Sequence, residues 1–351
     1  MIKLYLREKV QNKKIKSVYS IINKIRNFKM TIVKNIIKPI QNTYKKLSPF
    51  GKIVIFLVIF LSVVSFFNYA QSIKKREGFS GNIDTTKFTF YSENDKIYDD
   101  FYVDIYDDLV FNNVKTTYEI NQIVNNTKPS ENSIILDIGS GTGHHVAELA
   151  SKNFKVIGVD KSKNMVDKAK ELYPKLDFQQ GDVLMASMFQ KDSFTHILCL
   201  YFTIYYLNTN EKAAFFSNCM KWLKPGGYLV IHLVDREMFD PILPAANPLL
   251  MLSPQRYAKE RITQSKITFD DFRYKANFEL DPSKNTAKFI ENFEDKSSGK
   301  VFRKNEHQFY MENVKQILSQ AQDVGFIVQG KIDLIKSGYE YNMLYVLVKP
   351  E

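Results

Sequence analysis

Three glycines at alternate positions, Gly139, Gly141 and Gly143, mark the stretch of this sequence best suited to bind a ligand. They follow a short apolar run that contains Asp137, and a helix-like pattern begins directly after them. Glycine allows backbone dihedral angles that are closed to other residues, and it lets the chain approach a ligand closely. The free N–H groups at the start of the following helix favour a polar or anionic group. We therefore expect a strand, a tight ligand-binding turn and a helix.

A second carboxylate, Asp160, stands at the end of the next apolar run, which predicts another strand. An acid in this place can accept hydrogen bonds from both ribose hydroxyls of an adenosine-type ligand. It could instead cap the following helix, but Ser162 can do that, and we favour the ribose. His144 stands where a dinucleotide-binding fingerprint has its third glycine, which disfavours a nicotinamide cofactor.

The segments that must position these residues alternate between strands and helices. Strands are expected at residues 176–180, 194–200 and 228–234, and a helix at 211–223 ends at a Lys-Pro-Gly-Gly turn. Over residues 98–235, this order of elements and the G-x-G-x-G loop resemble class I S-adenosylmethionine-dependent methyltransferases, in particular those acting on small molecules. The resemblance implies an α/β fold with a doubly wound, Rossmann-like, seven-stranded sheet, an antiparallel last strand and a β-sheet insertion.

The same resemblance implies S-adenosyl-L-methionine as the cofactor. In the family, a strand-end acid and the glycine loop hold the amino-acid end of the cofactor, and a later acid and the next N–H meet the adenine. The residues implied to bind the cofactor here are Asp137, Gly139, Ser140, Gly141, Gly143, Asp160, Lys161, Asp182, Val183, Leu200 and Tyr201.

A tyrosine-rich helix and a sheet insertion are expected to enclose the methyl acceptor. Tyr98 and Tyr106 fall on one face of that helix and Tyr205 follows the fourth strand. We expect all three to contact substrate, although aromatic residues at helical spacing also pack in cores. Alternating runs at 262–272, 276–280 and 286–293 predict an antiparallel sheet within residues 236–310. A helix at 312–324 and strands beginning at residues 325 and 341 complete a domain at 98–351.

Methyl transfer from a sulfonium is an in-line displacement, so the protein mainly aligns the reactants in a dry cavity. A base is needed only where the acceptor must lose a proton. The candidates are His232 and Asp235, at the end of the fifth strand, and His307, each of which could instead only satisfy nearby backbone groups. His144 and His145 are expected to line the cofactor or to face solvent.

Several acceptor classes are disfavoured by the sequence. No Asn-Pro-Pro-Tyr run follows the fourth strand, which argues against adenine or glutamine amide nitrogens. Neither Cys199 nor Cys219 follows a proline, which argues against cytosine, and neither has metal-ligand spacing, so we expect no metal and two buried thiols. A small molecule, a lipid head group or a protein side chain remains. The competing hypotheses are a catalytically inactive module that tethers to a membrane and a nucleotide-cofactor oxidoreductase.

The net charge of +11 is concentrated in residues 1–52, which hold 14 Lys and Arg with Glu8 as their single acid. The rest of the chain is nearly neutral, which disfavours duplex nucleic acid as a partner. The basic N-terminal segment has isoleucines at helical spacing. It predicts either an amphipathic helix on an anionic membrane or the solvated flank of a membrane anchor.

Residues 53–70 are predicted to form a single transmembrane helix, because most of them are apolar and lysines flank them on both sides. A polar linker is expected at 71–97. The protein is thus predicted to be a single-pass membrane protein with the lipid bilayer as a partner. The positive charge before the span places the N-terminus in the cytosol and the catalytic domain across the membrane. The cytosolic supply of S-adenosylmethionine argues for the opposite orientation.

Overall fold

The computed structural model of the chain describes residues 44–45, 47–74, 85–246, 255 and 258–351, in two units, Met1–Arg76 and Glu77–Glu351. In the first unit, helix α3 (Pro49–Lys74) covers the predicted span at residues 53–70. Among the residues just given, no helix combines the length and the apolar character needed to cross a membrane. The predicted transmembrane helix is therefore not confirmed. Most of the basic segment at 1–52 lies outside the described residues.

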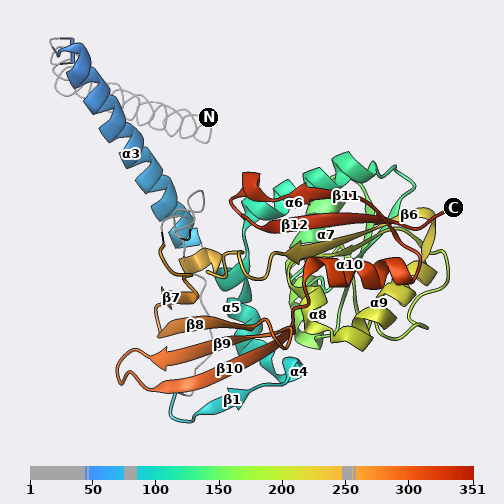
Figure 1. Cartoon of the computed structure of the whole chain (residues 1–351). Coiled ribbons are helices and arrows are strands. Elements are labelled where there is room, and N and C mark those ends of the chain that lie inside the picture. Colours follow the sequence, from blue (N-terminus) through green and yellow to red (C-terminus); the bar gives the residue numbers. More distant parts are fainter. Residues whose placement is uncertain (1–43, 46, 75–84, 247–254, 256–257) are drawn as a thin grey trace, which may run out of the picture. The chain divides into compact units, whose positions relative to one another are not determined.

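The second unit contains a seven-stranded sheet whose spatial order is β11-β12-β6-β5-β2-β3-β4 (Figure 1). Its strands are β2 (Ile134–Ile138), β3 (Lys155–Asp160), β4 (Asp177–Gln180), β5 (Phe194–Cys199), β6 (Leu223–Val234), β11 (Ile327–Asp333) and β12 (Asn342–Val348). The strands from β4 to β6 pair in parallel, whereas β12 is antiparallel to both of its neighbours. The predicted seven-stranded sheet with an antiparallel last strand is confirmed.

Helices cover both faces of this sheet. One face carries α6 (Asn113–Thr127), α7 (His144–Ser151) and α8 (Lys163–Leu172), and the other carries α9 (Thr209–Trp222) and α10 (Val314–Asp323). Successive side chains of a strand point to opposite faces, so Ile135 packs with α6 while Leu136 packs with α9. Because both faces are buried, the central strands read as continuous apolar runs in the sequence.

A second, five-stranded sheet has the order β1-β10-β9-β8-β7. Its strands are β1 (Thr89–Tyr91), β7 (Gln264–Thr268), β8 (Phe272–Asp281), β9 (Thr286–Asp295) and β10 (Val301–Tyr310). Strands β7 to β10 form the predicted antiparallel insertion. The predicted run at 262–272 is divided by a turn, in which the N–H of Phe269 donates to the carbonyl of Phe272. Two aspartates in this turn favour the reversal.

Two elements come from the segment predicted to be a linker at 71–97. Strand β1 pairs in parallel with β10, and α4 (Asn94–Ile97) follows it. The next helix, α5 (Asp100–Val110), is capped by Asp99, whose carboxylate accepts the N–H of Tyr102. The apolar face of α5 packs against the five-stranded sheet, with Ile105 and Leu109 among aromatic residues of β8 to β10. Helix α5 therefore belongs to the same layer as the insertion.

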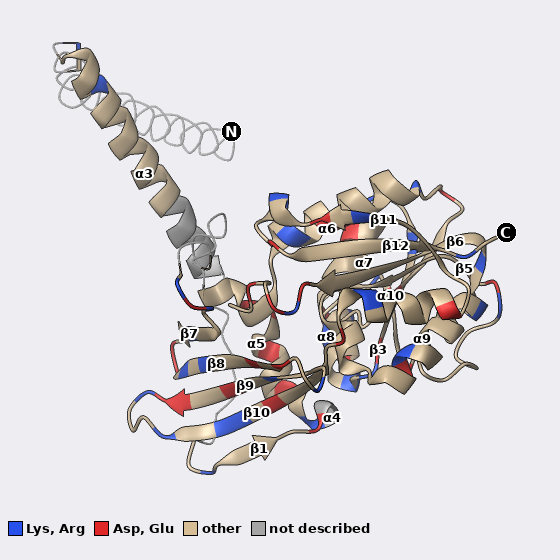
Figure 2. Ribbon diagram, in the orientation of Figure 1, with Lys and Arg blue, Asp and Glu red and all other residues tan. Residues whose placement is uncertain are grey.

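Acidic and basic residues are mixed over the elements of both sheets (Figure 2). Cross-strand ion pairs join Lys275 to Glu294 and Lys288 to Glu306, each at 2.6 Å, on the exposed face of the insertion. This distribution agrees with the near-neutral balance of the sequence after residue 52. Cys199 and Cys219 are both buried and reduced, as predicted.

Candidate active site

A cavity of about 450 Å³ opens at the carboxyl ends of the parallel strands of the large sheet. Ligands of open α/β sheets bind at this edge. We divide its lining into two parts. The glycine-loop half comprises the ends of β2, β3, β4 and β5 and the loops after them. The aromatic half comprises Tyr98, which lies just before α5 and not on that helix as predicted, and residues of α5, of the short helix η2 (Thr203–Tyr206) and of the insertion, namely Tyr102, Tyr106, Tyr206, Phe289, His307 and Phe309.

The glycine loop has the backbone geometry that its sequence predicts. Gly139, Gly141 and Gly143 have φ angles of +68°, +53° and +92°. A Cβ atom on Gly139 would lie 2.4 Å from the side chain of Thr203, so no other residue fits without displacing it. The N–H of Gly139 donates to the carbonyl of Val159 at 2.8 Å. The loop is thereby tied to β3, and the two strand ends form one platform.

Asp160 faces the cavity from the end of β3. Its carboxylate accepts the N–H of Gly141 and the N–H of Ser162, each at 2.9 Å. Burial raises the pKa of Asp160, although the backbone donors oppose that shift. The cap of α8 is Ser162, whose Oγ accepts the N–H of Met165 at 3.3 Å. Asp160 is therefore not the helix cap, and its remaining lone pairs are available to a diol.

Two oxygen atoms beside the loop are buried and have no partner among the described residues, Oδ2 of Asp137 and Oγ of Ser140. Ser140 lines the cavity, whereas Asp137 lies in β2, is 1% exposed and is not part of the lining. Burial raises the pKa of Asp137 to about 6. An unpartnered buried carboxylate oxygen is costly unless a donor reaches it. These atoms fit the ammonium group at the amino-acid end of S-adenosylmethionine.

Four further residues predicted to bind the cofactor line the cavity, Lys161, Asp182, Val183 and Tyr201. Nζ of Lys161 lies 3.4 Å from Oδ2 of Asp182, so the two are held together beside the end of β4. Gly143 and Leu200 are not part of the lining. Gly143 is the N-cap residue of α7, and Leu200 is buried in the core on the α6 side of the sheet.

His232 lines the cavity, but both of its ring nitrogens are engaged. Nδ1 lies 2.6 Å from the carbonyl oxygen of Tyr201, and Nε2 lies 3.1 Å from Oδ1 of Asn342. Burial, and secondarily the charge of Lys115, lower the pKa of His232 to about 4. The imidazole is therefore neutral at neutral pH and is held by its neighbours rather than turned towards an acceptor.

Beside His232 lies a buried charged cluster of Lys115, Glu119 and His145. Nζ of Lys115 is 2.6 Å from Glu119, which is 3.2 Å from Nε2 of His145. Burial alone would raise the pKa of Glu119, but the charge of Lys115 and the hydrogen bond with His145 lower it to about 2. Lys115 also lies 3.6 Å from the centre of the Tyr201 ring. The cluster fixes the end of β5 from the side of α6.

Two of the residues predicted for the site lie outside the cavity. Asp235 is exposed in the turn after β6, where its carboxylate accepts the N–H of Glu237 at 3.1 Å. Tyr205 is buried in the core, and its hydroxyl oxygen accepts the N–H of Val234 at 2.9 Å. Strand-end residues of these types often satisfy backbone groups in this way.

The aromatic half brings together Tyr98, Tyr106 and His307, three of the predicted residues. The hydroxyl of Tyr206 lies 2.8 Å from the hydroxyl of Tyr98 and 2.9 Å from Nδ1 of His307. On its other side, Nε2 of His307 lies 2.9 Å from Oε2 of Glu291. These four side chains form a continuous hydrogen-bonded chain, which we call the Tyr–His–Glu chain, from the cavity into the insertion.

Tyr206, Glu291 and Lys115 were not predicted. Tyr206 adjoins Tyr205, and the sequence alone does not show which of the two turns towards the cavity. Glu291 lies in β9 on the face shared with Phe289 and Phe293, and an acid among alternating apolar residues is a signal that could have identified it. Lys115 has no comparable signal, because a lysine four residues before a glutamate usually marks an exposed helix face.

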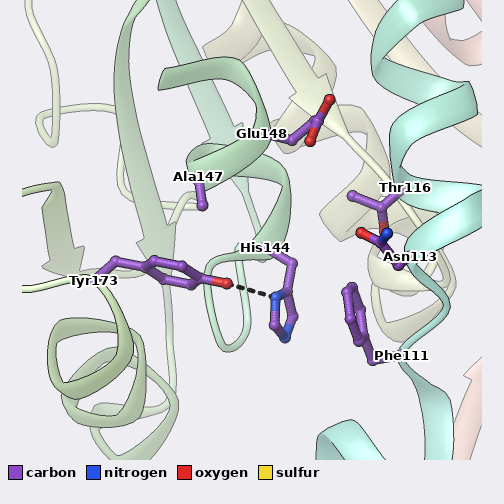
Figure 3. Close-up of a pocket in the computed structure, with 7 residues that line it drawn as sticks. All are labelled: Phe111, Asn113, Thr116, His144, Ala147, Glu148 and Tyr173. Carbon is purple, nitrogen blue, oxygen red and sulfur yellow. Dashed lines mark hydrogen bonds between the residues drawn. The ribbon is translucent and has the colours of Figure 1, made fainter. Parts of the chain in front are cut away.

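A smaller cavity of about 350 Å³ is lined by residues of α7 and of the start of α6, together with Phe111 and Tyr173 (Figure 3). There the ring of His144 stacks on Phe111 with centroids 3.7 Å apart, and its Nδ1 lies 2.7 Å from the Tyr173 hydroxyl. Nε2 of His144 lies 2.8 Å from Asp107 of α5, which also accepts the hydroxyl of Thr142 at 2.6 Å. We call these contacts the Asp107 latch. They join α5 directly to the glycine loop.

Known proteins resemble this chain in sequence and in fold. Residues 135–227 match a family described as a methyltransferase domain. Phosphoethanolamine N-methyltransferase 1 of Triticum aestivum is 27% identical over 129 residues, which are 36% of this chain and 26% of that protein. Phosphoethanolamine N-methyltransferase of Plasmodium falciparum (isolate 3D7) is 33% identical over 114 residues, or 31% and 42% of the two chains. This chain therefore spans about a quarter to two-fifths of the length of these relatives.

Among solved structures, the CcbJ methyltransferase from Streptomyces caelestis superposes with a TM-score of 0.55. The alignment covers 74% of this chain and 100% of that one, at 15% sequence identity. Identity this low supports a shared fold and nothing finer. The fold expected from the glycine loop and the order of the strands is the one observed.

Proposed function

Residues 135–227 carry a class I S-adenosylmethionine-dependent methyltransferase domain, and from this premise we propose that the protein transfers a methyl group to a small-molecule acceptor. The proposal depends on one observation: a single cavity is lined both by the glycine-loop half, which fits the cofactor, and by the aromatic half, which suits an acceptor. The names of the two N-methyltransferase relatives support a small nitrogen compound as the acceptor. A cavity of about 450 Å³, shared with the cofactor, suits a small acceptor better than the surface of a folded protein.

The glycine-loop half would hold the cofactor through atoms that are already in place. Asp160 would accept hydrogen bonds from the ribose diol, and Oδ2 of Asp137 and Oγ of Ser140 would meet the amino-acid end. Bound there, S-adenosylmethionine supplies an electrophilic methyl group on a sulfonium. The residues of this chain contribute alignment and exclusion of water, which together can account for most of the barrier reduction in such a displacement.

The test uses the full-length protein and two measurements. Calorimetry should show binding of S-adenosylmethionine and S-adenosylhomocysteine and no binding of NAD. Radiolabelled S-adenosylmethionine, incubated with the small-molecule fraction of a cell extract, should then yield a labelled product that excess S-adenosylhomocysteine suppresses. Cofactor binding without any transfer would leave an inactive binding module as the better description. Binding of NAD in preference would point to an oxidoreductase.

We further propose that residues 53–70 anchor the protein in a membrane as a single-pass protein. The support is the sequence of that segment, which is nearly all apolar and lies between lysines. After cell fractionation the protein should stay with the membranes during alkaline carbonate extraction, and a variant lacking residues 1–76 should be released. Protease treatment of sealed microsomes, with a tag after Glu351, then reports the orientation. Protection of the tag would agree with the charge bias of the N-terminal segment, and digestion would agree with cytosolic cofactor supply.

A further inference from the structure

Glu291 ends the Tyr–His–Glu chain as a fully buried carboxylate whose neighbours all donate to it. It accepts the hydroxyls of Tyr102 at 2.8 Å and Tyr274 at 2.6 Å, and the side-chain amide of Asn305 at 2.8 Å. Burial alone would raise the pKa of Glu291, but His307, Tyr274 and Asn305 hold it below its usual value. Glu291 is therefore ionised at neutral pH. It is a fixed negative charge at the far end of the chain.

The charge on Glu291 determines the direction of every hydrogen bond in the chain. A carboxylate only accepts, so the Nε2–H of His307 donates to it, and a neutral imidazole then presents a lone pair at Nδ1. That lone pair accepts the O–H of Tyr206, 2.9 Å away. The oxygen of Tyr206 is in turn free to accept from the Tyr98 hydroxyl or from a ligand. A proton that enters at the tyrosine pair is thus led towards His307.

The two tyrosines do not serve as phenolate bases. Burial is the main reason that the pKa values of Tyr98 and Tyr206 lie well above the ordinary value. A hydroxyl of this kind can still accept one proton while it gives up another. His307, which lies next to a buried carboxylate and is 2% exposed, is the residue in the chain that can keep the proton.

The lining of the cavity favours a cation over an anion. Among the described lining residues, the acidic side chains (five Asp or Glu) outnumber the Lys and Arg side chains (two lysines). Lys115 and Lys161 are each paired with an acid and belong to the α6 and β4 sides of the cavity, away from the aromatic half. The aromatic half offers four tyrosine rings and two phenylalanine rings, whose faces attract an ammonium group.

We propose that the methyl acceptor is a small amine that enters as its ammonium ion, and that the Tyr–His–Glu chain removes its proton. The inference deepens the proposed methyltransferase function and rests on it. One N–H of the ammonium gives its proton to the oxygen of Tyr206 as the Tyr206 hydroxyl proton moves to Nδ1 of His307. Where the ammonium meets Tyr98 instead, Tyr98 takes that proton and passes its own hydroxyl proton to Tyr206 in the same relay. Glu291 balances the resulting imidazolium.

The neutral amine nitrogen then attacks the methyl carbon. A nitrogen–carbon bond forms as the carbon–sulfur bond of the cofactor breaks, and the electron pair stays on sulfur. The products are an N-methylammonium ion and S-adenosylhomocysteine, and the proton on His307 leaves to solvent when the site opens. Tyr98, Tyr206 and His307 line the cavity and are catalytic residues on this scheme, while Glu291 is a positioning residue.

The first experiment identifies the element that receives the methyl group, without needing to know the acceptor. Full-length protein and S-adenosylmethionine with an isotope-labelled methyl group are incubated with the small-molecule fraction of a cell extract, and NMR separates N-methyl from O-methyl and S-methyl products. An N-methyl product is expected. An O-methyl or S-methyl product would overturn the inference while leaving the methyltransferase function intact. No labelled product at all would count against the proposed function itself.

The second experiment tests the chain through Tyr206→Phe and His307→Asn, with Tyr345→Phe as the matched control. Among the described residues, the Tyr345 hydroxyl donates one hydrogen bond, to Met343 Sδ at 3.6 Å, and Tyr345 is not part of the cavity lining. The initial rate of labelled transfer at pH 7 should fall about a hundredfold or more in the first two variants, as for loss of a general base. Their affinity for S-adenosylhomocysteine, and the rate of the control, should stay within twofold of wild type.

The pH profile separates proton removal from a structural role. Since the solution itself deprotonates more of the amine as pH rises, the deficit of Tyr206→Phe should shrink about tenfold per pH unit up to the pKa of the amine. The titratable groups that face His307 are Tyr98, Tyr102, Tyr206 and Glu291. The pKa values of the three tyrosines are raised well above the ordinary value, so these side chains keep their protons from pH 7 up to the pKa of the amine. A deficit that does not change with pH, or a rate equal to wild type, would overturn the proposal.

Discussion

In the glycine-loop half of the cavity, the groups that face a ligand are held by the backbone over short distances in the sequence. In the aromatic half they are held by side chains from distant segments. Asp160 meets the N–H of Gly141, 19 residues away, whereas Tyr206 meets His307 and Tyr98 across 101 and 108 residues. The first arrangement depends on a turn that three glycines make possible. The second depends on two separate elements, α5 and the insertion, reaching the same place.

This difference assigns the two halves different tasks. A site made from strand ends and N–H groups is rigid and recognises what every reaction cycle requires, the cofactor. A site made from side chains on an added helix and sheet can be changed residue by residue without disturbing the strands beneath it. On the proposed function, acceptor specificity would therefore belong to the aromatic half. Substitutions in the two halves should fail in different ways, the first in cofactor binding and the second in the rate of transfer.

The largest effect is expected from Gly139→Ala in the glycine-loop half. The new Cβ would lie 2.4 Å from Thr203, and φ is +68°, so both the loop and η2 must move. A displacement on the order of 1 Å can cost about a hundredfold, and we expect at least that loss in affinity for S-adenosylhomocysteine by calorimetry. Gly226→Ala is the control, since φ is +72° there and no atom lies within 4 Å of the added carbon.

The double variant Gly139→Ala with Thr203→Ala sharpens this test. It removes the two Thr203 atoms that clash most closely and leaves the backbone strain at residue 139 unchanged. Partial recovery of affinity would identify the steric clash as the cause. Equal affinity in Gly139→Ala and Gly226→Ala would show that the contact with Thr203 yields easily and that the loop is less rigid than proposed.

Asp160→Ala should weaken cofactor binding more than tenfold. The variant loses charged hydrogen bonds to the ribose and leaves the N–H groups of Gly141 and Ser162 without their acceptor. Calorimetry measures the affinity, and circular dichroism checks that the fold survives. Asp177→Ala, an exposed aspartate at the start of the neighbouring strand β4, should bind as wild type does. Unchanged affinity in Asp160→Ala would mean that the carboxylate only orders the loop.

The same difference explains what the sequence could predict. The glycine spacing, the strand-end acids and the apolar runs are local patterns. They predicted the seven-stranded sheet and most of the residues that line the glycine-loop half, although Asp137, Gly143 and Leu200 lie outside the lining. His307 and Tyr98 were also chosen, but as separate candidates. Their connection through Tyr206 depends on how the segment before α5, the helix η2 and strand β10 meet, and no local pattern encodes it. Asp235 and Tyr205 were chosen because each follows a strand, but both lie outside the cavity, where each accepts a backbone N–H.

Substitution of Asp137 tests whether the glycine-loop half keeps an unpartnered carboxylate in place for its ligand at a cost to the stability of the fold. Its folded pKa of about 6 lies above the ordinary value, so it contributes stability below pH 4 that is lost as the pH rises through 6. Asp137→Asn lacks this titration. Relative to wild type, the variant should gain about 2–3 kcal/mol between pH 4 and pH 7, or about 5–10 °C in melting temperature.

Thermal unfolding of both proteins across that pH range gives the measurement, and the difference between them removes the titration of all other groups. Saturating S-adenosylmethionine should stabilise wild type more than Asp137→Asn, because the ammonium group of the ligand meets the buried charge. A difference in melting temperature that stays constant from pH 4 to pH 7 would show that water or a neighbouring group already solvates this carboxylate.

The smallest effect is expected from Asp107→Ala, which breaks the latch that joins the two halves. The variant removes the acceptor of the Thr142 hydroxyl and the partner of His144, so α5 is no longer tied to the glycine loop. Helix α5 keeps its apolar packing on the insertion. The effect should therefore be limited to the dissociation of S-adenosylhomocysteine, which should become about threefold faster, with little change in its association rate.

Asp104→Ala is the matched control on the same helix, because its carboxylate meets Lys168 of α8 at 3.0 Å and does not contact the loop. Stopped-flow displacement measures both rates. Equal rates in the two variants would show that the halves open independently, and a transfer rate reduced as strongly as in Tyr206→Phe would show that the latch positions the acceptor as well as the cofactor.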